Sequence, residues 1–204
     1  MTMPKSLLFR LDGTLRPGVT AKDIVLHLLS LPGVRAGACV GRLVEFAGTA
    51  IAGLSTDERA TLTNMTAELG GFGGIVAPDA ETVRFLKARR GIDFTIEAWM
   101  RSDPDARFDD TIAVDCSALS PMVAAPGDPG NGRPITEVAE RPRVDIAYGG
   151  SCTGGKRDDF DQYHAVLSWA ARRGMQVAAG TRLYLQFGTL GVRDIYQAAI
   201  ENYI

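Results

Sequence analysis

The residues best suited to chemistry lie in a glycine-rich segment, residues 148–156, with the sequence Tyr-Gly-Gly-Ser-Cys-Thr-Gly-Gly-Lys. Its centre, Ser151-Cys152-Thr153, follows an apolar stretch typical of a strand and precedes a stretch typical of a helix. Ligands of parallel α/β sheets bind at the carboxyl ends of strands, where backbone N–H groups favour anions. Cys152 could therefore be a metal or cluster ligand, a catalytic nucleophile, or a turn cysteine without a chemical role. A phosphate-binding loop is excluded, because Arg157 follows the final lysine where Ser or Thr is required.

A second segment, residues 7–15, resembles the signature of haloacid-dehalogenase phosphatases through Asp12-Gly13 and the threonine that follows. In that signature a nucleophilic aspartate stands two positions before the second aspartate. This position holds Arg10, whose guanidinium group cannot form an aspartyl-phosphate. We therefore expect a strand that ends in an Asp-Gly turn.

Strands and helices alternate along the chain. Thr20 with Asp23, and Ser55 with Glu58, form patterns typical of helix N-termini, and Asp79 is a third expected cap. Strands are predicted over residues 5–11, 40–46, 73–78, 111–114, 144–148, 175–178 and 183–187. Helices are predicted over residues 21–30, 55–69, 79–90, 156–173 and 192–203. This alternation predicts an α/β fold with mostly parallel sheets.

The composition excludes several classes of protein. The 204 residues are 46% hydrophobic and carry a net charge of −2, as in an ordinary globular protein. Because no cluster of Lys and Arg is present, neither a nucleic-acid nor an anionic-membrane partner is expected. No apolar stretch is long enough for a membrane span or a signal peptide, so the protein is predicted to be cytoplasmic.

The remaining cysteines and the histidines are predicted to be structural. Three widely spaced cysteines do not resemble a secreted disulfide framework. Cys39 and Cys116 are expected to be buried small apolar residues. His27 and His164 lie in predicted helices without a partner at a spacing typical of a metal or catalytic site.

Nearly the whole chain resembles the aconitase superfamily, which includes aconitase, homoaconitase and the large subunit of 3-isopropylmalate dehydratase. The Gly-Ser-Cys-Thr sequence around Cys152 is similar to the cluster-binding turn of these proteins. Further matching stretches follow in the order of the family: residues 17–23, 41–48, 54–59, 64–65 with 68–71, 78–79 and 115–124.

The resemblance implies a hydro-lyase that uses a [4Fe-4S] cluster as Lewis acid on a hydroxy di- or tricarboxylate of the isopropylmalate, homocitrate or citrate class. Cys152 matches the first of three cysteine ligands and would be the metal ligand of this chain, with Ser151 and Thr153 as further cofactor-binding residues. Glu45 matches the acidic residue of the Val-Glu-Phe/Tyr motif. In the family this residue lies near the open iron and helps to handle the departing water, so Glu45 is the expected catalytic residue.

The resemblance also implies that residues 1–105 are the second domain of such an enzyme and residues 106–204 a third domain, incomplete at its C-terminus. Each is expected to be a three-layer α/β/α domain. The other two cluster ligands belong to a Cys-x-x-Cys beyond the position that matches Ile204. We therefore expect the isolated chain to lack a cluster and to be inactive. Its expected partners are the remaining aconitase-type domains or a small swivelling-domain subunit. The alternative is a non-catalytic aconitase-like module that binds a small anion or a partner chain.

Overall fold

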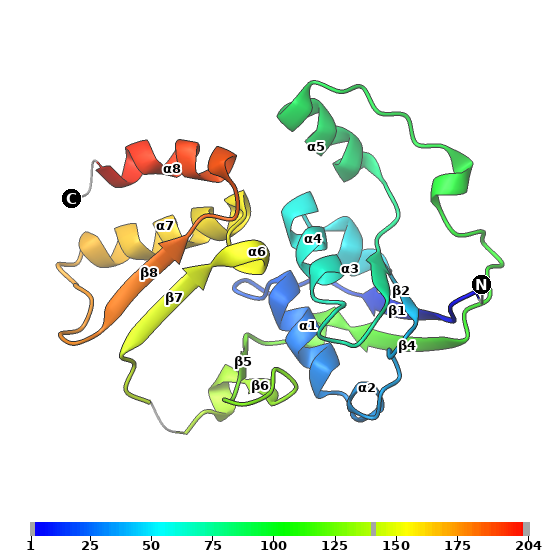
Figure 1. Cartoon of the computed structure of the whole chain (residues 1–204), viewed down its shortest axis with the longest axis horizontal. Helices are drawn as coiled ribbons and strands as arrows, with labels where there is room; N and C mark the ends of the chain where they lie inside the picture. Colours follow the sequence, from blue (N-terminus) through cyan, green and yellow to red (C-terminus); the bar gives the residue numbers. More distant parts are fainter. Residues whose placement is uncertain (1–2, 140–141, 202–204) are drawn as a thin grey trace. The chain divides into compact units, whose positions relative to one another are not determined.

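The computed structural model describes residues 3–139 and 142–201, with side chains up to residue 197 (Figure 1). The chain forms two compact units, Met1–Ala139 and Glu140–Ile204, and each is described by itself. Strands and helices alternate in both units, and each has parallel strand pairs. The predicted α/β fold with mostly parallel sheets is confirmed. Within the described residues, no helix is long and apolar enough to cross a membrane.

The first unit contains a four-stranded parallel sheet in the order β3-β2-β1-β4. Its strands are β1 (Ser6–Asp12), β2 (Leu43–Ala47), β3 (Gly73–Ile75) and β4 (Asp110–Asp115). Its α-helices are α1 (Ala21–Ser30), α2 (Pro32–Arg35), α3 (Thr49–Ala52), α4 (Thr56–Asn64) and α5 (Ala80–Arg90). The single-turn helices are η1 (Ala98–Met100), η2 (Cys116–Ala118) and η3 (Ile135–Glu137), and an antiparallel hairpin pairs β5 (Met122–Ala124) with β6 (Gly132–Pro134).

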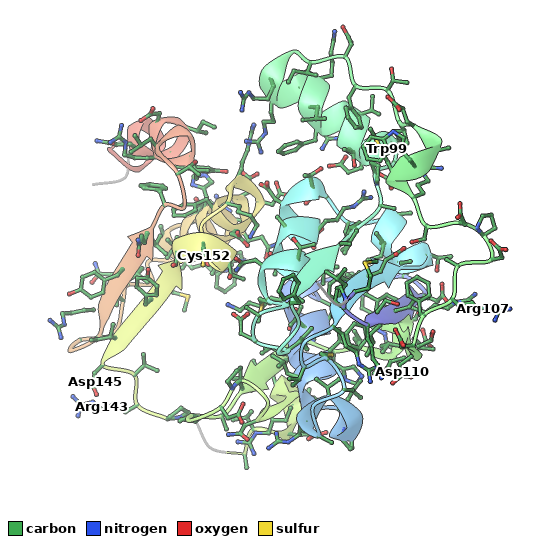
Figure 2. The ribbon with its side chains drawn as sticks, turned by 45° about the vertical axis from the view of Figure 1, so that its right-hand side comes forward. Trp99, Arg107, Asp110, Arg143, Asp145 and Cys152 are labelled. Carbon is green, nitrogen blue, oxygen red and sulfur yellow. The ribbon has the colours of Figure 1, made fainter. Side chains whose placement is uncertain are left out.

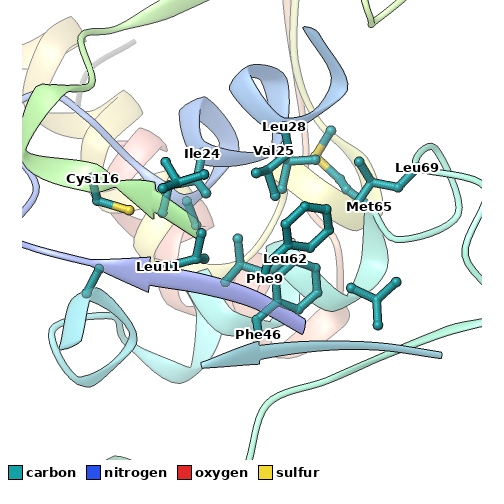
Figure 3. Packing of buried hydrophobic residues seen from close by; sticks show 14 of the residues in the cluster. Phe9, Leu11, Ile24, Val25, Leu28, Phe46, Leu62, Met65, Leu69 and Cys116 are labelled. Atoms are coloured by element: carbon teal, nitrogen blue, oxygen red, sulfur yellow. The ribbon is translucent and has the colours of Figure 1, made fainter. Parts of the chain in front are cut away.

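The core of this unit lies on one face of the sheet. Strand β1 alternates, with Leu7, Phe9 and Leu11 fully buried. The Phe9 ring stacks on Phe46 of β2 at 5.6 Å between centroids. Figure 3 shows these side chains pointing toward α1, whose apolar residues close the core: Ile24, Val25 and Leu28. Because side chains alternate along a strand, the residues between the buried ones point to the opposite face.

Local capping explains where the helices begin. The Asp23 carboxylate accepts hydrogen bonds from the backbone N–H and hydroxyl of Thr20, and the Ser55 hydroxyl accepts one from the Glu58 N–H at 3.1 Å. The side chain of Asp79 caps α5 in the same way. The predicted starts of α1, α4 and α5 are therefore confirmed. Each cap satisfies N–H groups that would otherwise have no partner in the first turn.

Several predicted boundaries were wrong. The helix predicted over residues 55–69 ends at Asn64, and turns continue to Gly70. The strand predicted over 40–46 begins at Leu43, since Val40 lies in a turn and is largely exposed. The strand predicted over 73–78 ends at Ile75. At these three places the apolar residues extend beyond the helix or strand. The predicted element was therefore longer than the observed one.

A buried ion pair joins three elements of the first unit. Arg59 on α4 is 5% exposed and donates two hydrogen bonds to the carboxylate of Asp79, at 2.6 and 2.8 Å. The same guanidinium donates to the backbone oxygens of Ile51 and Leu54. This arrangement lowers the pKa of Asp79, chiefly through the hydrogen bonds from Arg59. The pair therefore holds α3, α4 and the N-terminus of α5 together.

We expect Arg59→Met to destabilise the first unit by about 3 kcal/mol, because it leaves buried carbonyls and one carboxylate without their donor. The control is Lys87→Ala, which removes the exposed pair with Asp93 and should cost less than about 1 kcal/mol. Native-state hydrogen exchange of the core amides of β1 measures both free energies of unfolding. Equal effects of the two substitutions would contradict the structural role of Arg59.

The second unit contains two parallel strands, β7 (Ile146–Gly150) and β8 (Arg182–Gln186). Its helices are α6 (Ser151–Gly154), α7 (Arg157–Ala171) and α8 (Leu190–Glu201). The core is small and aromatic: Phe160 of α7 stacks on Phe187 at 4.4 Å and contacts Tyr163 and Tyr196. The strand predicted over residues 175–178 was wrong, because these residues form an exposed loop. The predicted helix over 192–203 begins at Leu190, and its last residues lie outside the described range.

Strand β4 belongs to the first unit because it pairs with β1 from Leu7↔Asp110 to Asp12↔Asp115. The compact units therefore divide after Ala139, whereas the resemblance places the end of the second family domain at residue 105. Strand β4, which contains the strand predicted over residues 111–114, lies at one edge of the sheet. The assignment of residues 1–105 and 106–204 to family domains stays a prediction.

Candidate functional site

Cys152 lies at the carboxyl end of a parallel strand. Strand β7 ends at Gly150, and the single turn of α6 that follows carries Cys152 with its thiol exposed (Figure 2). The Sγ atom is 3.7 Å from the Thr153 hydroxyl. The sequence prediction of a strand, a glycine-rich turn and a helix is confirmed, with the addition of the short helix α6.

The backbone of this turn requires glycine. Gly150 has φ +128°, and a Cβ there would lie 2.1 Å from the backbone oxygen of Gln186 at the end of β8. A Cβ on Gly155 would lie 2.3 Å from the oxygen of Ser151. Ser151 itself has φ +69°, a left-handed conformation that residues other than glycine adopt only at some cost. The close approach to β8 thus determines how the turn presents Cys152.

Hydrogen bonds from α7 hold the turn. The Tyr163 hydroxyl donates to the backbone oxygen of Gly154 at 3.0 Å, and the Lys156 ammonium donates to the backbone oxygen of Thr153. Asp159 accepts from the Lys156 backbone N–H at 2.9 Å, which caps α7. The thiol therefore projects from a rigid support, as an oriented ligand or nucleophile requires.

The other two cysteines are buried in the core of the first unit, as predicted. Burial raises the pKa of the Cys39 thiol. The pKa of Cys116 is raised to about 11, first by burial and then by the negative charges of Asp115 and Asp12. Both thiols stay protonated and inert near neutral pH, so Cys152 is the cysteine available to solvent.

Glu45 lies in the middle of β2 in the first unit. Its neighbours Val44 and Phe46 are buried, so Glu45 points to the face of the sheet opposite the core. We call this the open face of the sheet. The Ser102 hydroxyl donates to the Glu45 carboxylate at 2.6 Å. Ser102 belongs to the segment between α5 and β4, so this segment reaches the open face of the sheet and orients the carboxylate.

The two histidines lie on helices of different units. His27 is half-buried on α1, and burial lowers its pKa. His164 lies on α7, with its Nε2 atom 3.5 Å from the Ser168 hydroxyl. Their structural role stays a prediction, consistent with these surroundings.

Residues 3–139 and 142–201 contain no group of three or more His, Cys, Asp or Glu side chains placed to hold a metal ion. Cluster ligation in proteins needs several thiolates, and Cys152 supplies one. The described residues by themselves therefore do not fit a four-iron cluster.

Two features of this region could not be read from the sequence. Ser102 is 57 residues from Glu45, and no local pattern signals its hydrogen bond. Arg10 donates to Asp12 at 2.8 Å on the open face of the sheet. The alternation of apolar residues around Arg10 indicates that its side chain points away from the core. It does not indicate the hydrogen bond to Asp12.

The fold and these geometries define a class: a parallel α/β protein with an oriented thiol at a strand end. Residues 1–144 match the model of the aconitase family (aconitate hydratase). The chain belongs to the aconitase family.

Curated relatives agree with this membership. The 3-isopropylmalate dehydratase large subunit of Moorella thermoacetica is 36% identical over 200 residues, 98% of this chain and 44% of that protein. The corresponding subunit of Syntrophus aciditrophicus is 38% identical with the same coverage. That of Gloeobacter violaceus is 34% identical over 220 residues, 90% of this chain and 45% of that protein. The chain thus spans less than half the length of these relatives.

We expect one of the three thiols to react rapidly with a chromogenic disulfide in the native protein at neutral pH. The reactive group is Cys152, because Cys39 and Cys116 are buried with raised pKa values. Cys152→Ser should remove the fast phase, whereas Cys39→Ser, the matched control, should retain it. Fast reaction of a second thiol in the folded Cys152→Ser protein would contradict this assignment.

Proposed function

We propose that the chain is part of an aconitase-type hydro-lyase that dehydrates and hydrates a hydroxy di- or tricarboxylate of the isopropylmalate, homocitrate or citrate class. The observation that carries the proposal is the exposed Cys152 on a glycine-constrained turn at the end of β7, within a chain of this family. The relatives named as 3-isopropylmalate dehydratase large subunits favour a substrate of the isopropylmalate type.

In the intact enzyme, Cys152 would be one thiolate ligand of a [4Fe-4S] cluster, with Ser151 and Thr153 beside it. Bound there, the cluster would supply Lewis acidity toward the substrate hydroxyl. The hydrogen-bonded, glycine-constrained turn supports this role, because it fixes the direction in which the thiol points. The left-handed backbone of Ser151 is consistent with a turn shaped for function.

Glu45 would hold or release the proton of the departing or entering water. A carboxylate suits general acid–base chemistry when it is oriented toward the reacting group. The Ser102 hydroxyl donates to its Oε2 atom at 2.6 Å. The two carboxylate oxygens can thus have different roles, one in orientation and the other in proton transfer.

The isolated chain is proposed to be inactive, since its described residues supply one thiolate. The remaining ligands would come from further aconitase-type domains, with a small swivelling-domain subunit as an additional partner. A cytoplasmic location is part of this proposal. The alternative is a non-catalytic aconitase-like module that binds a small anion or a partner chain without a cluster.

Anaerobic reconstitution with iron and sulfide tests the proposal. We expect the chain alone to bind far fewer than four irons and to show no turnover of isopropylmalate or citrate, because it supplies too few thiolates. A stable brown protein with a four-iron spectrum and turnover would contradict this expectation.

The same experiment with the missing parts tests the proposed roles. The remaining domains of the Moorella thermoacetica relative and its small subunit would be added as separate polypeptides. We expect a cluster with the wild-type chain, none with Cys152→Ser, and a cluster with at least about 100-fold lower turnover with Glu45→Gln. Absence of a cluster from every mixture, despite complex formation, would favour the non-catalytic module.

The second unit supports the proposal of partner domains. Parallel sheets are normally covered on both faces, yet Ile146, Tyr148 and Tyr184 are about half exposed. In-register pairing of Tyr148 with Tyr184 places both rings on the same face. An apolar face of this kind is typical of a surface that another chain or domain covers.

We expect the isolated chain to self-associate at high concentration, because this face otherwise stays in contact with water. Replacing Tyr148 and Tyr184 with Thr should reduce association, whereas Ile135→Thr, an equally exposed apolar residue of the first unit, should not. Static light scattering over a range of concentrations measures the effect. A monomeric wild-type chain throughout that range would contradict the prediction.

A further inference from the structure

Arg10 occupies an unusual position for a cation. It lies in β1, a strand with neighbours on both sides, and its side chain is 65% exposed on the open face of the sheet. The residues beside it are Ala47 on β2 and Ala113 on β4. Since both neighbours are small, no adjacent side chain on these strands covers the guanidinium.

A neighbouring carboxylate holds the Nε side of the guanidinium. Its Nε donates to the Asp12 carboxylate at 2.8 Å. The other Asp12 oxygen accepts from the backbone N–H of Thr49 at 3.0 Å and from its hydroxyl at 3.3 Å. These bonds lower the pKa of Asp12, the backbone bond from Thr49 most and the Arg10 bond next. The Asp12 carboxylate therefore orients the Arg10 side chain through Nε.

Arg10 shares its sheet face with Glu45. Leu8 is the partner of Glu45 in the register between β1 and β2, and Arg10 is two residues further along the same face. Diagonal neighbours of this kind lie within reach of long side chains. Within the four strands of this sheet, Arg10 is the cation on the open face.

A guanidinium group in this position would stabilise a dianionic substrate beside Glu45. Two substrate carboxylates near a catalytic carboxylate repel it, and a guanidinium group offsets this repulsion with two parallel hydrogen bonds. The Nη atoms of Arg10 offer that fork, and Asp12 restrains the side chain at Nε.

We propose that Arg10 binds a carboxylate group of the substrate on the open face of the sheet, next to Glu45. This inference rests on the proposed hydro-lyase function and adds a specificity-determining residue to it. It also gives a role to Arg10, which stands where the phosphatase signature has its nucleophilic aspartate.

NMR titration of the full chain with 3-isopropylmalate tests the proposal directly. We expect saturable shifts of the Arg10 Nε–Hε signal and of the Ala47 and Ala113 amides, and none with the uncharged dimethyl ester. Arg10→Gln should weaken binding at least tenfold, and Arg10→Lys should weaken it less, since Lys keeps the charge without the fork. The matched control is Arg16→Gln, an exposed arginine of the following loop, which should leave the affinity unchanged.

The outcomes separate this inference from the proposed function. Wild-type affinity in a folded Arg10→Gln chain, or no saturable shift at these three residues, would overturn the role of Arg10. Cluster formation through Cys152 in the reconstitution experiment would then still stand. Conversely, the titration could show carboxylate binding at Arg10 while no cluster forms in the mixed polypeptides. That result would support the role of Arg10 in binding and refute the hydro-lyase proposal.

Discussion

The parallel pairing of β1 with both β2 and β4 is the constraint on which the first unit depends. Because β1 lies between two strands, its side chains are divided strictly between two faces. Leu7, Phe9 and Leu11 build the core against α1, which leaves Arg10 on the open face with its neighbours in register. A shift of one residue would bury Arg10 and expose the core. The hydrophobic packing thus determines where the charged groups lie.

Both units use the same device at the end of a strand. Gly48, directly after β2, has φ +121°, and Gly150, the last residue of β7, has φ +128°. A Cβ at Gly48 would collide with the backbone of Leu11, as one at Gly150 would with that of Gln186. In each case a single helical turn follows, α3 or α6. In each unit this close approach of two backbones positions the helical turn that follows. That turn carries Thr49, which donates to Asp12, in the first unit and Cys152 in the second.

Sequence alone predicts the elements whose ends are set by local chemistry. Helices α1 and α5 match their predicted ranges because Asp23 and Asp79 cap them and glycine or proline follows closely. Three of the four residues 175–178 are apolar, yet the segment forms an exposed loop. The hydrogen bond from Ser102 to Glu45 has no sequence signal, since it depends on how a long connection folds back.

The two proposed chemical residues differ in how they are held. Glu45 stands within a strand, where the ladder fixes its backbone and one hydroxyl from a distant segment orients its carboxylate. Cys152 stands beyond a strand, where close contact between backbones and the bonds from α7 fix the turn. Pairing within the sheet thus positions Glu45, whereas a turn that depends on glycine positions Cys152.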